Sequence, residues 1–357
     1  MSHLKTSEKL TILISVVASV AAGLLSGRDA VILAFVVSAL ALATLASVVG
    51  LATEQLGERM GPGATGILQS GIGNLPELFV SIFALRAGLV AVVQAALIGS
   101  ILANSLLVLG LAFLVGGLKH GTQKFSSDQP KIIATLVLLS IAALTVPTLA
   151  HQLHTPAGAH GESLSIFVAI VMLAVFICSI VYSLRKRTAE EVADEKATHG
   201  PGGESWPLAM TIGILAVAGV GAAFVSDWFV VALEPAMKSL HLSEAFTGLV
   251  VVAIAGNAVE NVVGIQLAAR NKADYAVSVI LNSSLQIALG LIPVLVILSF
   301  FVGSSHLTLI MPPLLVVAVG FAGILGAMVV FDGESVWMEG VVLIALYGII
   351  AAAFWWG

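Results

Sequence analysis

The chain has 357 residues, of which 59% are hydrophobic and 10% are charged, and its mean hydropathy is +1.09. A soluble globular domain is about half apolar and about a quarter charged, so this composition excludes one and indicates an integral membrane protein. The net charge of −5 argues against a nucleic-acid partner. The single cysteine, Cys178, excludes an intramolecular disulfide.

Apolar runs of roughly 20 residues, the length that a helix needs to cross the hydrocarbon core, recur along nearly the whole chain. They predict an all-α polytopic protein of the lipid bilayer. About eleven transmembrane helices are expected, at 11–27, 29–51, 64–86, 89–116, 131–150, 163–184, 207–226, 243–268, 273–300, 307–330 and 335–356. Because Lys5 and Lys9 precede the first run, a cleaved signal peptide is its alternative interpretation.

The basic residues sort unevenly between the two sides that these spans define. Of the 15 Lys and Arg residues, 12 fall on the side of the N-terminus, which leaves Arg28, Arg86 and Lys238 opposite. Since basic residues concentrate in cytoplasmic loops, the N-terminus is predicted to be cytoplasmic.

One short motif occurs twice, 183 residues apart. It reads Gly73-Asn74-Leu75-Pro76-Glu77 in its first copy and Gly256-Asn257-Ala258-Val259-Glu260 in its second. In both copies a serine follows the glutamate by 23 residues, Ser100 after Glu77 and Ser283 after Glu260. The equal spacing predicts an internal repeat.

The repeat divides the chain into four parts. Residues 1–28 hold the N-terminus and the first helix, 29–184 the first repeat, 185–206 an acidic cytoplasmic linker, and 207–357 the second repeat. Since each repeat has five spans, an odd number, the second copy must insert upside down relative to the first. Inverted repeats are typical of secondary transporters, which bind their substrate near the midplane where the repeats meet.

Glu77 and Glu260 are the acidic residues that fall well inside predicted spans. An ionised group at the bilayer centre costs about 2.5–3.5 kcal/mol on insertion scales, so such a residue is functional by default. Pro76 is expected to break its helix just before Glu77, and Val259 at the matching position predicts a milder break in the second copy. Freed carbonyl oxygens at such breaks suit cation binding.

The chemistry of the two motifs favours a hard cation. Carboxylates, the amides of Asn74 and Asn257, and carbonyls near Gly73 and Gly256 make an all-oxygen site, which suits Ca²⁺. If the two carboxylates lie about 6 Å apart, their repulsion at an effective dielectric of 20 is roughly 3 kcal/mol. The pair should therefore hold either a divalent cation or protons, and this mutual exclusion is a physical basis for antiport.

Polar residues of the two following spans are pathway candidates. Ser100 and Asn104 are four residues apart, and Ser283 and Gln286 are three apart, so each pair shares a helix face. Ordinary hydrogen bonding between helices is the alternative role for these residues.

At these residues the chain resembles the cation/proton exchangers of the calcium/cation antiporter superfamily. The stretches from Gly73 to Asn104 and from Gly256 to Gln286 are similar to the two signatures of that family, with departures at Asn261, where histidine is common, and at Asn282. The resemblance implies one helix followed by two inverted repeats of five, and export of Ca²⁺ in exchange for H⁺. It also implies that Glu77 and Glu260 bind the metal and carry the protons.

The resemblance and the chain length favour the inner membrane of a prokaryotic cell. No cofactor is expected, since Ca²⁺ would be the transported substrate, and association into a homo-oligomer is left open. A Na⁺/Ca²⁺ exchanger or a monovalent cation/H⁺ exchanger is the nearest alternative. An intramembrane enzyme is disfavoured, because no His-Glu-x-x-His or Gly-x-Ser-x-Gly motif is present.

Overall fold

A computed structural model of the protein describes residues 4–28, 30–60, 71–126, 128–186, 206–302 and 306–355. Within these ranges the regular structure is helical apart from two strands of two residues each, which confirms the all-α class. Nine helices of the described residues are long and apolar enough to cross a membrane, and a tenth is added if the bent pair Glu244–Gly256 and Asn261–Ala269 forms one span. The expected span at 64–86 is described only from Gly71, and the total of eleven stays a prediction.

The chain divides into two compact units. Unit 1 consists of Met1–Val80 and Ala174–Ala236, and unit 2 of Ser81–Leu173 and Met237–Gly357. Each unit therefore takes segments from both halves of the sequence. The helices that lie wholly or partly in unit 1 are α1 (Thr6–Leu25), α2 (Val31–Met60), α4 (Leu75–Arg86), α8 (Gly161–Lys186) and α10 (Leu208–Leu240).

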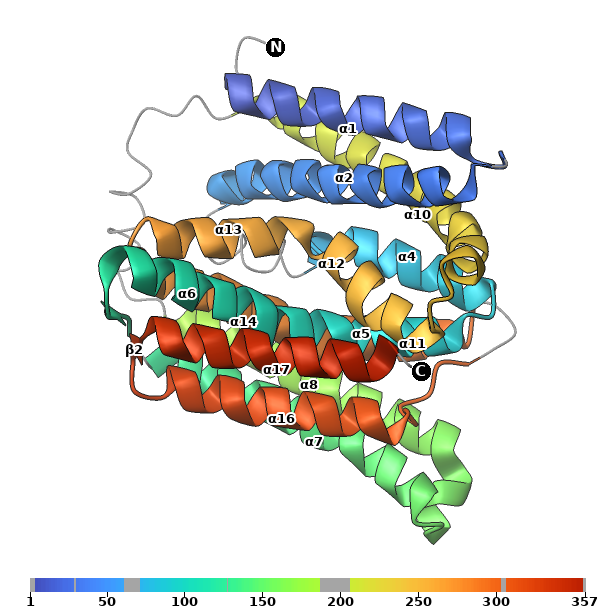
Figure 1. The fold of residues 1–357 in the computed structure, drawn as a ribbon, viewed down its shortest axis with the longest axis vertical. Coiled ribbons are helices and arrows are strands. Elements are labelled where there is room, and N and C mark those ends of the chain that lie inside the picture. The colour runs from blue at the N-terminus through green and yellow to red at the C-terminus, as the bar shows by residue number, and fades with distance from the viewer. Residues whose placement is uncertain are drawn as a thin grey trace. The chain divides into compact units, whose positions relative to one another are not determined.

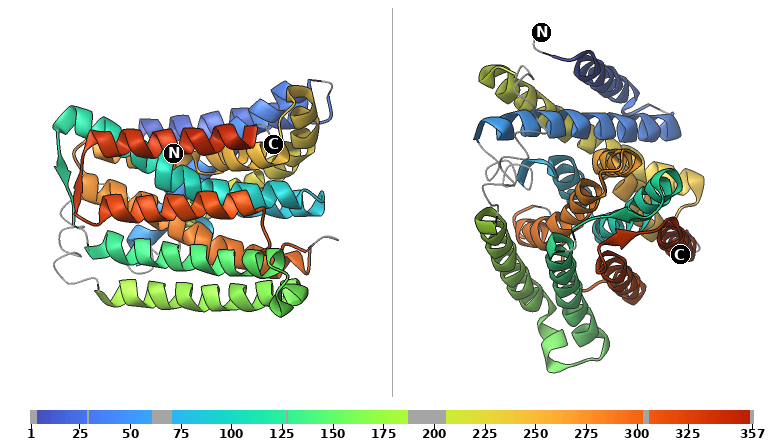
Figure 2. Two further views of the ribbon diagram at one scale, coloured as in Figure 1. Left: turned by 60° about the horizontal axis from the view of Figure 1, so that its bottom comes forward. Right: turned by 90° about the vertical axis from the view of Figure 1, so that its left-hand side faces the viewer.

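Unit 1 is held together by apolar contacts of α2 with α1 and α10. In Figure 2 α1 and α2 lie side by side near the N-terminus. The rings of Phe35 on α2 and Phe229 on α10 stack with their centroids 5.1 Å apart. The fully buried Trp206 packs with Leu4 and Ala52. Its backbone N–H donates to Gln55 Oε1 at 2.9 Å, so the last residue of the predicted acidic linker is anchored on α2. The rest of the linker, 187–205, lies outside the described residues.

Unit 2 contains the remaining elements. They are α5 (Val90–Leu102), η1 (Ala103–Val108), α6 (Leu109–His120), β1 (Gln123–Lys124), α7 (Asp128–Gln152), η2 (Pro156–His160), α11 (Glu244–Phe246), η3 (Thr247–Val252), α12 (Ala253–Gly256), α13 (Ala258–Ala269), α14 (Ala273–Leu285), η4 (Gln286–Leu291), α15 (Ile292–Ser299), α16 (Pro313–Val330), β2 (Glu334–Ser335) and α17 (Trp337–Trp355).

The centre of unit 2 is α5, which is buried along its whole length from Val92 to Leu102. Around it, α17 runs along α6 and α16 runs along α7 (Figure 1). The outer helices expose large apolar side chains, such as Phe321 on α16 and Ile349 on α17, which are 58% and 66% exposed. Such a surface is stable only against lipid, so these helices carry the face of the unit that meets the bilayer.

The interval of 183 residues also relates the helices themselves. Adding 183 to the bounds of α4, α5 and η1 (75–86, 90–102 and 103–108) gives 258–269, 273–285 and 286–291, which are the bounds of α13, α14 and η4. Outside the short motifs the two stretches differ in sequence, yet their helices begin and end at matching positions. This correspondence supports the internal repeat inferred from the motifs.

The two strands were not among the expected elements, because a strand of two residues carries no periodic signal in the sequence. They pair antiparallel, Gln123 with Ser335 and Lys124 with Glu334, and Phe125 N donates to Gly333 O at 2.8 Å. Gly121 and Gly333 turn the chain beside them with φ of 75° and 77°, a region that glycine adopts without strain. The ribbon joins the end of α6 to the start of α17.

Candidate cation site

Glu77 lies in the first turn of α4, as its third residue. The preceding helical residues end at Ile72, Gly73 and Asn74 form a turn, and α4 begins at Leu75, with Leu78 N donating to Asn74 O at 3.0 Å. The break therefore comes slightly earlier than expected. Pro76 is the second residue of α4, a position where its missing N–H leaves no helix bond unmade.

The surroundings of Glu77 are those of a functional acid. Its side chain is 9% exposed and that of Asn74 is 7% exposed, and Glu77 is the one buried carboxylate among the side chains that the structure describes. A carboxylate in the first turn of a helix also lies at the positive end of the helix dipole.

The second motif breaks its helix in the same way. α12 ends at Gly256, Asn257 adopts φ −95° and ψ 20°, and α13 begins at Ala258, with Glu260 as its third residue. The segments on either side of this break are bent by 62°, although no proline is present. The Asn257 side chain braces the end of α12, because its Nδ2 donates at 2.9 Å to Ala253 O, the same carbonyl that accepts from the Asn257 backbone N–H at 3.2 Å. The side chain of Glu260 lies outside the described residues.

Four of the sequence-predicted residues form one buried network in unit 2. Asn257 Nδ2 donates to Ser100 Oγ at 2.8 Å, while Asn104 Nδ2 donates to Ser283 Oγ at 2.9 Å and, more weakly, to Asn257 Oδ1 at 3.4 Å. All four side chains are at most 5% exposed. The network joins α5 and η1 of the first repeat to the α12–α13 break and α14 of the second.

The side-chain nitrogen of Asn104 is hydrogen-bonded, but its side-chain oxygen is not. Asn104 is fully buried, and its Oδ1 has no hydrogen-bond partner among the described residues. Oδ1 of Asn261, one helical turn beyond Asn257, is also a buried oxygen without a hydrogen-bond partner among the described residues. A buried amide oxygen without a donor costs about 1–3 kcal/mol unless water or a cation meets it, so both are candidate ligands.

Two glycines let the network form. A Cβ added at Gly99 would collide with the backbone of Leu249 in η3, and one added at Gly248 would collide with the carbonyl oxygen of Val92 in α5. The backbones of α5 and η3 therefore touch at a crossing that admits no side chain. Because Gly99 precedes Ser100, this crossing sets how near Ser100 comes to Asn257.

The spans around the site contain three π-helical segments. η1 includes Asn104, η3 leads into the α12–α13 break, and η4 begins at Gln286. A π turn inserts an extra residue and redirects the side chains that follow, and such segments are frequent at functional sites. Their placement shows that the irregular backbone of unit 2 gathers where its polar side chains gather.

The far end of α13 is held by side chains from another element. Lys119 Nζ donates to Ala269 O at 3.0 Å, and Gln123 Nε2 donates to Ala268 O at 3.1 Å and to Asn271 Oδ1 at 2.8 Å. The last turn of α13 has no basic residue of its own. The end of α6 and β1 thus cap the helix whose first turn carries Glu260.

Within unit 2 the structure brings some of the predicted site residues together, but not all of them. Ser100, Asn104, Asn257 and Ser283 are brought together, while Gln286 is half-buried at the start of η4. Glu77, Asn74 and Gly73 lie in unit 1, and the approach of the two glutamates stays a prediction. The sequence did not indicate that Ser105 pairs with Ser284, a weaker pathway candidate, although their buried hydroxyls are 3.1 Å apart. Ser105 directly follows Asn104, and Ser284 directly follows Ser283. This position next to two pathway candidates was the feature of the sequence that could have indicated the pair.

Comparison with known proteins identifies the family. A family model described as sodium/calcium exchanger protein matches residues 30–185 and 210–356. The chain belongs to this family. It is 36% identical over 337 residues to a Ca(2+)/H(+) antiporter of Synechocystis sp. and 35% identical over 323 residues to the Ca(2+)/H(+) antiporter ChaA of Bacillus subtilis. These alignments cover 90% of this chain and 90% and 91% of the two relatives.

Solved structures of exchangers have the same fold. The structure of native YfkE matches with a TM-score of 0.80 at 31% identity and covers 98% of this chain and 100% of that one. An H+/Ca2+ exchanger CAX matches with a TM-score of 0.77 at 17% identity, over 98% of this chain and 92% of that one, which shows a shared fold. The resemblance noted in the sequence is confirmed, and the protein is a multi-pass membrane protein of a transporter family.

The glycine crossing gives a test of the site's construction. Gly99→Ala should lower the midpoint of thermal unfolding in detergent and the free energy of unfolding by roughly 1–3 kcal/mol, because the backbone that it meets cannot rotate away as a side chain would. Gly320→Ala in α16 is the matched control, since a Cβ there meets nothing within 4 Å. It should be neutral or raise stability by up to about 1 kcal/mol. Equal midpoints for the two variants would contradict the crossing.

Proposed function

We propose that this protein exchanges cytoplasmic Ca²⁺ for H⁺ by alternating access. The observation that carries the proposal is the buried carboxylate Glu77 at a helix break, with a second break of the same form at Asn257. The function of the relatives, two of which are Ca(2+)/H(+) antiporters from bacteria, supports it. The prokaryotic inner membrane, with the N-terminus in the cytoplasm, is the proposed location.

The roles of the residues follow from their chemistry. Glu77 and Glu260 alternately bind the cation and carry protons. Asn74, Asn257 and the backbone near Gly73 and Gly256 supply neutral oxygens. The oxygens of Asn104 and Asn261 have no partner within the described part of the chain, so within unit 2 they are available as further neutral ligands beside the second motif. Carboxylate and amide oxygens at flexible backbone suit Ca²⁺ better than zinc or copper.

The hydrogen-bonded network has a separate role in this mechanism. Ser100, Asn104, Asn257 and Ser283 bond to one another, so their orientation does not depend on the ion. Preorganised ligands lose little entropy when the cation binds and need little rearrangement when protons replace it. The network thus steadies the second break while the carboxylates change partners.

The two acids are tested by Glu77→Gln and Glu260→Gln in liposomes with an acidic interior, following Ca²⁺ entry and internal pH together. Each variant should abolish exchange, because glutamine keeps the shape of glutamate but can neither carry the proton nor neutralise the metal. Glu334→Gln is the matched control. Glu334 is half exposed in β2 and pairs with Lys124 at 3.2 Å, an exposed contact worth about 0–1 kcal/mol, so exchange should persist. Exchange retained in either site variant would refute the assignment.

A sodium-coupled exchanger is the nearest alternative, because the family includes sodium/calcium exchangers. In vesicles with uniform pH, an outward Na⁺ gradient should drive no Ca²⁺ entry, whereas an outward H⁺ gradient of equal size should. The reason is that carboxylates from both repeats hold protons in exchange for the metal. Uptake driven by Na⁺ alone would favour the alternative.

The charge balance gives a further prediction. If each glutamate carries one proton, two H⁺ replace one Ca²⁺ and no net charge moves. The initial rate of Ca²⁺ uptake should then be the same when the membrane potential is clamped at zero or at a negative value with K⁺ and valinomycin. A rate that rises or falls with the clamped potential would exclude this stoichiometry.

A further inference from the structure

The segment between α15 and α16 is an extended stretch of buried backbone. We call residues 307–311 the strap. Leu307, Leu309 and Met311 are 1%, 0% and 3% exposed, yet the strap belongs to no helix or sheet. Buried backbone without a ladder must find other hydrogen-bond partners. The strap finds them in side chains.

Three hydroxyl groups accept the N–H groups of the inward-facing strap residues. The pairs are Leu307 N to Ser299 Oγ at 2.9 Å, Leu309 N to Ser165 Oγ at 3.0 Å, and Met311 N to Thr148 Oγ1 at 3.0 Å. The hydroxyls come from three different helices, α15, α8 and α7. The strap therefore ties three helix ends of unit 2 together.

The carbonyl groups of the strap are satisfied in the same manner. Gln94 on α5 donates its side-chain Nε2 to Thr308 O at 3.0 Å and to Ile310 O at 2.9 Å. Thr148 Oγ1 donates to Leu309 O at 3.1 Å. A fourth helix, the buried centre of the unit, is thus joined to the strap. All of these partners are uncharged, so the hydrogen bonds that hold the strap itself do not depend on pH.

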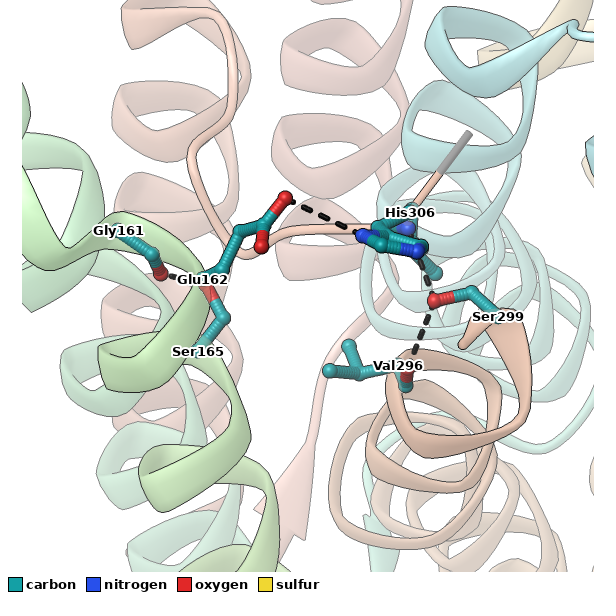
Figure 3. Close-up of polar contacts among 7 residues, drawn as sticks. Gly161, Glu162, Ser165, Val296, Ser299 and His306 are labelled. Carbon is teal, nitrogen blue, oxygen red and sulfur yellow. Dashed lines mark hydrogen bonds and ion pairs between the residues drawn. The ribbon is translucent and has the colours of Figure 1, made fainter. Parts of the chain in front are cut away.

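One ionisable contact stands at the edge of the strap. His306, the residue before it, lies 3.2 Å from Glu162 Oε1 in the first turn of α8, measured from Nδ1 (Figure 3). The imidazole also stacks on the ring of Phe300, with centroids 4.2 Å apart. The side chains of His306 and Glu162 are 37% and 62% exposed, so both are open to protons from the solution.

The packed elements offer His306 no other charged partner at this end. α5, α15, α16 and the strap contain no ionisable residue, and Glu162 is the one such residue in the part of α8 that belongs to unit 2. The nearby end of α7, the turn after it and η2 carry only further histidines, His151, His154 and His160, all of them exposed. Among the histidines of these described elements, His306 is the one that has a carboxylate partner.

We propose that His306 and Glu162 form a regulatory proton-binding site that tightens the strap in acid. Histidine changes its charge between about pH 5 and 8. When protonated, the imidazole makes a charge-assisted contact with the Glu162 carboxylate and presents a cation to the ring of Phe300. When neutral, it keeps at most an ordinary hydrogen bond. The strap is therefore held more firmly at low pH, and the effect is lost as the pH rises.

The site is distinct from the proposed exchange site, and it does not depend on which ions are exchanged. It acts on the loop that joins α15 to α16, on the side that the predicted orientation places outside the cytoplasm. Because the pair is exposed, the change should be modest, about two- to fivefold in the opening equilibrium of the strap. Protonation of the pair therefore changes how often the strap opens, while the closed strap stays the main state.

Amide hydrogen exchange of the full-length protein in detergent tests the proposal without measuring transport. After correction for the intrinsic pH dependence, the peptide that covers 306–312 should be about two- to fivefold more protected at pH 6 than at pH 8. The difference should vanish in His306→Gln and in Glu162→Gln. Peptides from α5 should keep full protection throughout, which shows that each variant is folded.

A charge reversal and a matched histidine sharpen the test. In Glu162→Lys the protonated imidazole faces a like charge, so the pH difference should change sign. His160→Gln removes a neighbouring exposed histidine and should leave the difference as in the parent protein. Equal protection of the parent protein at both pH values, or an unchanged difference in His306→Gln, would overturn the proposal. Failure of Ca²⁺/H⁺ exchange would refute the proposed function and would leave this result untouched.

Discussion

The polar groups inside this protein are bound by one constraint. A polar atom buried between apolar helices costs free energy unless it is hydrogen-bonded or meets an ion, and a membrane offers no solvent to relieve it. The network of Ser100, Asn104, Asn257 and Ser283 satisfies the constraint among its own members. Among the described residues of unit 2, the buried oxygens without a hydrogen-bond partner are Oδ1 of Asn104 and Asn261 and the hydroxyls of Ser335 and Tyr347. The two amide oxygens belong to the network and to the helix of the second motif, so they are the candidate ligands.

The backbone is adapted to the same constraint. At the second helix break, the backbone N–H and the side-chain Nδ2 of Asn257 both donate to Ala253 O, so one residue closes the end of α12. The glycine crossing of α5 and η3 then brings the hydroxyl of Ser100 within bonding distance of Asn257. Flexible, ion-accepting backbone and close helix packing are thus consequences of the same few small and amide-bearing residues. The same strategy recurs at the strap, where hydroxyls and one glutamine replace a β ladder.

The two repeats correspond in backbone from α4 to η1 but only in part in their side chains. Ser100 and Ser283 match at the interval of 183, whereas Asn104 has the apolar Ile287 as its counterpart. Asn104 nevertheless bonds to residues of the second repeat, so the break at Asn257 is supported by the first repeat in a way that the sequence does not mirror.

The sequence by itself determined the membrane class, the repeat, the helix breaks at the two motifs and four members of the buried network, because composition, spacing and residue chemistry are local properties. The preceding helical residues end at Ile72, four positions before Pro76, where the ring of a proline would clash with the carbonyl of a continuing helix. Only the tertiary structure decided that Asn104 bonds across the repeats, that Ser105 faces Ser284, that Lys119 caps α13, and that His306 meets Glu162. These contacts join residues 144 to 179 positions apart. They depend on how helices cross in space, which no pattern along one segment determines.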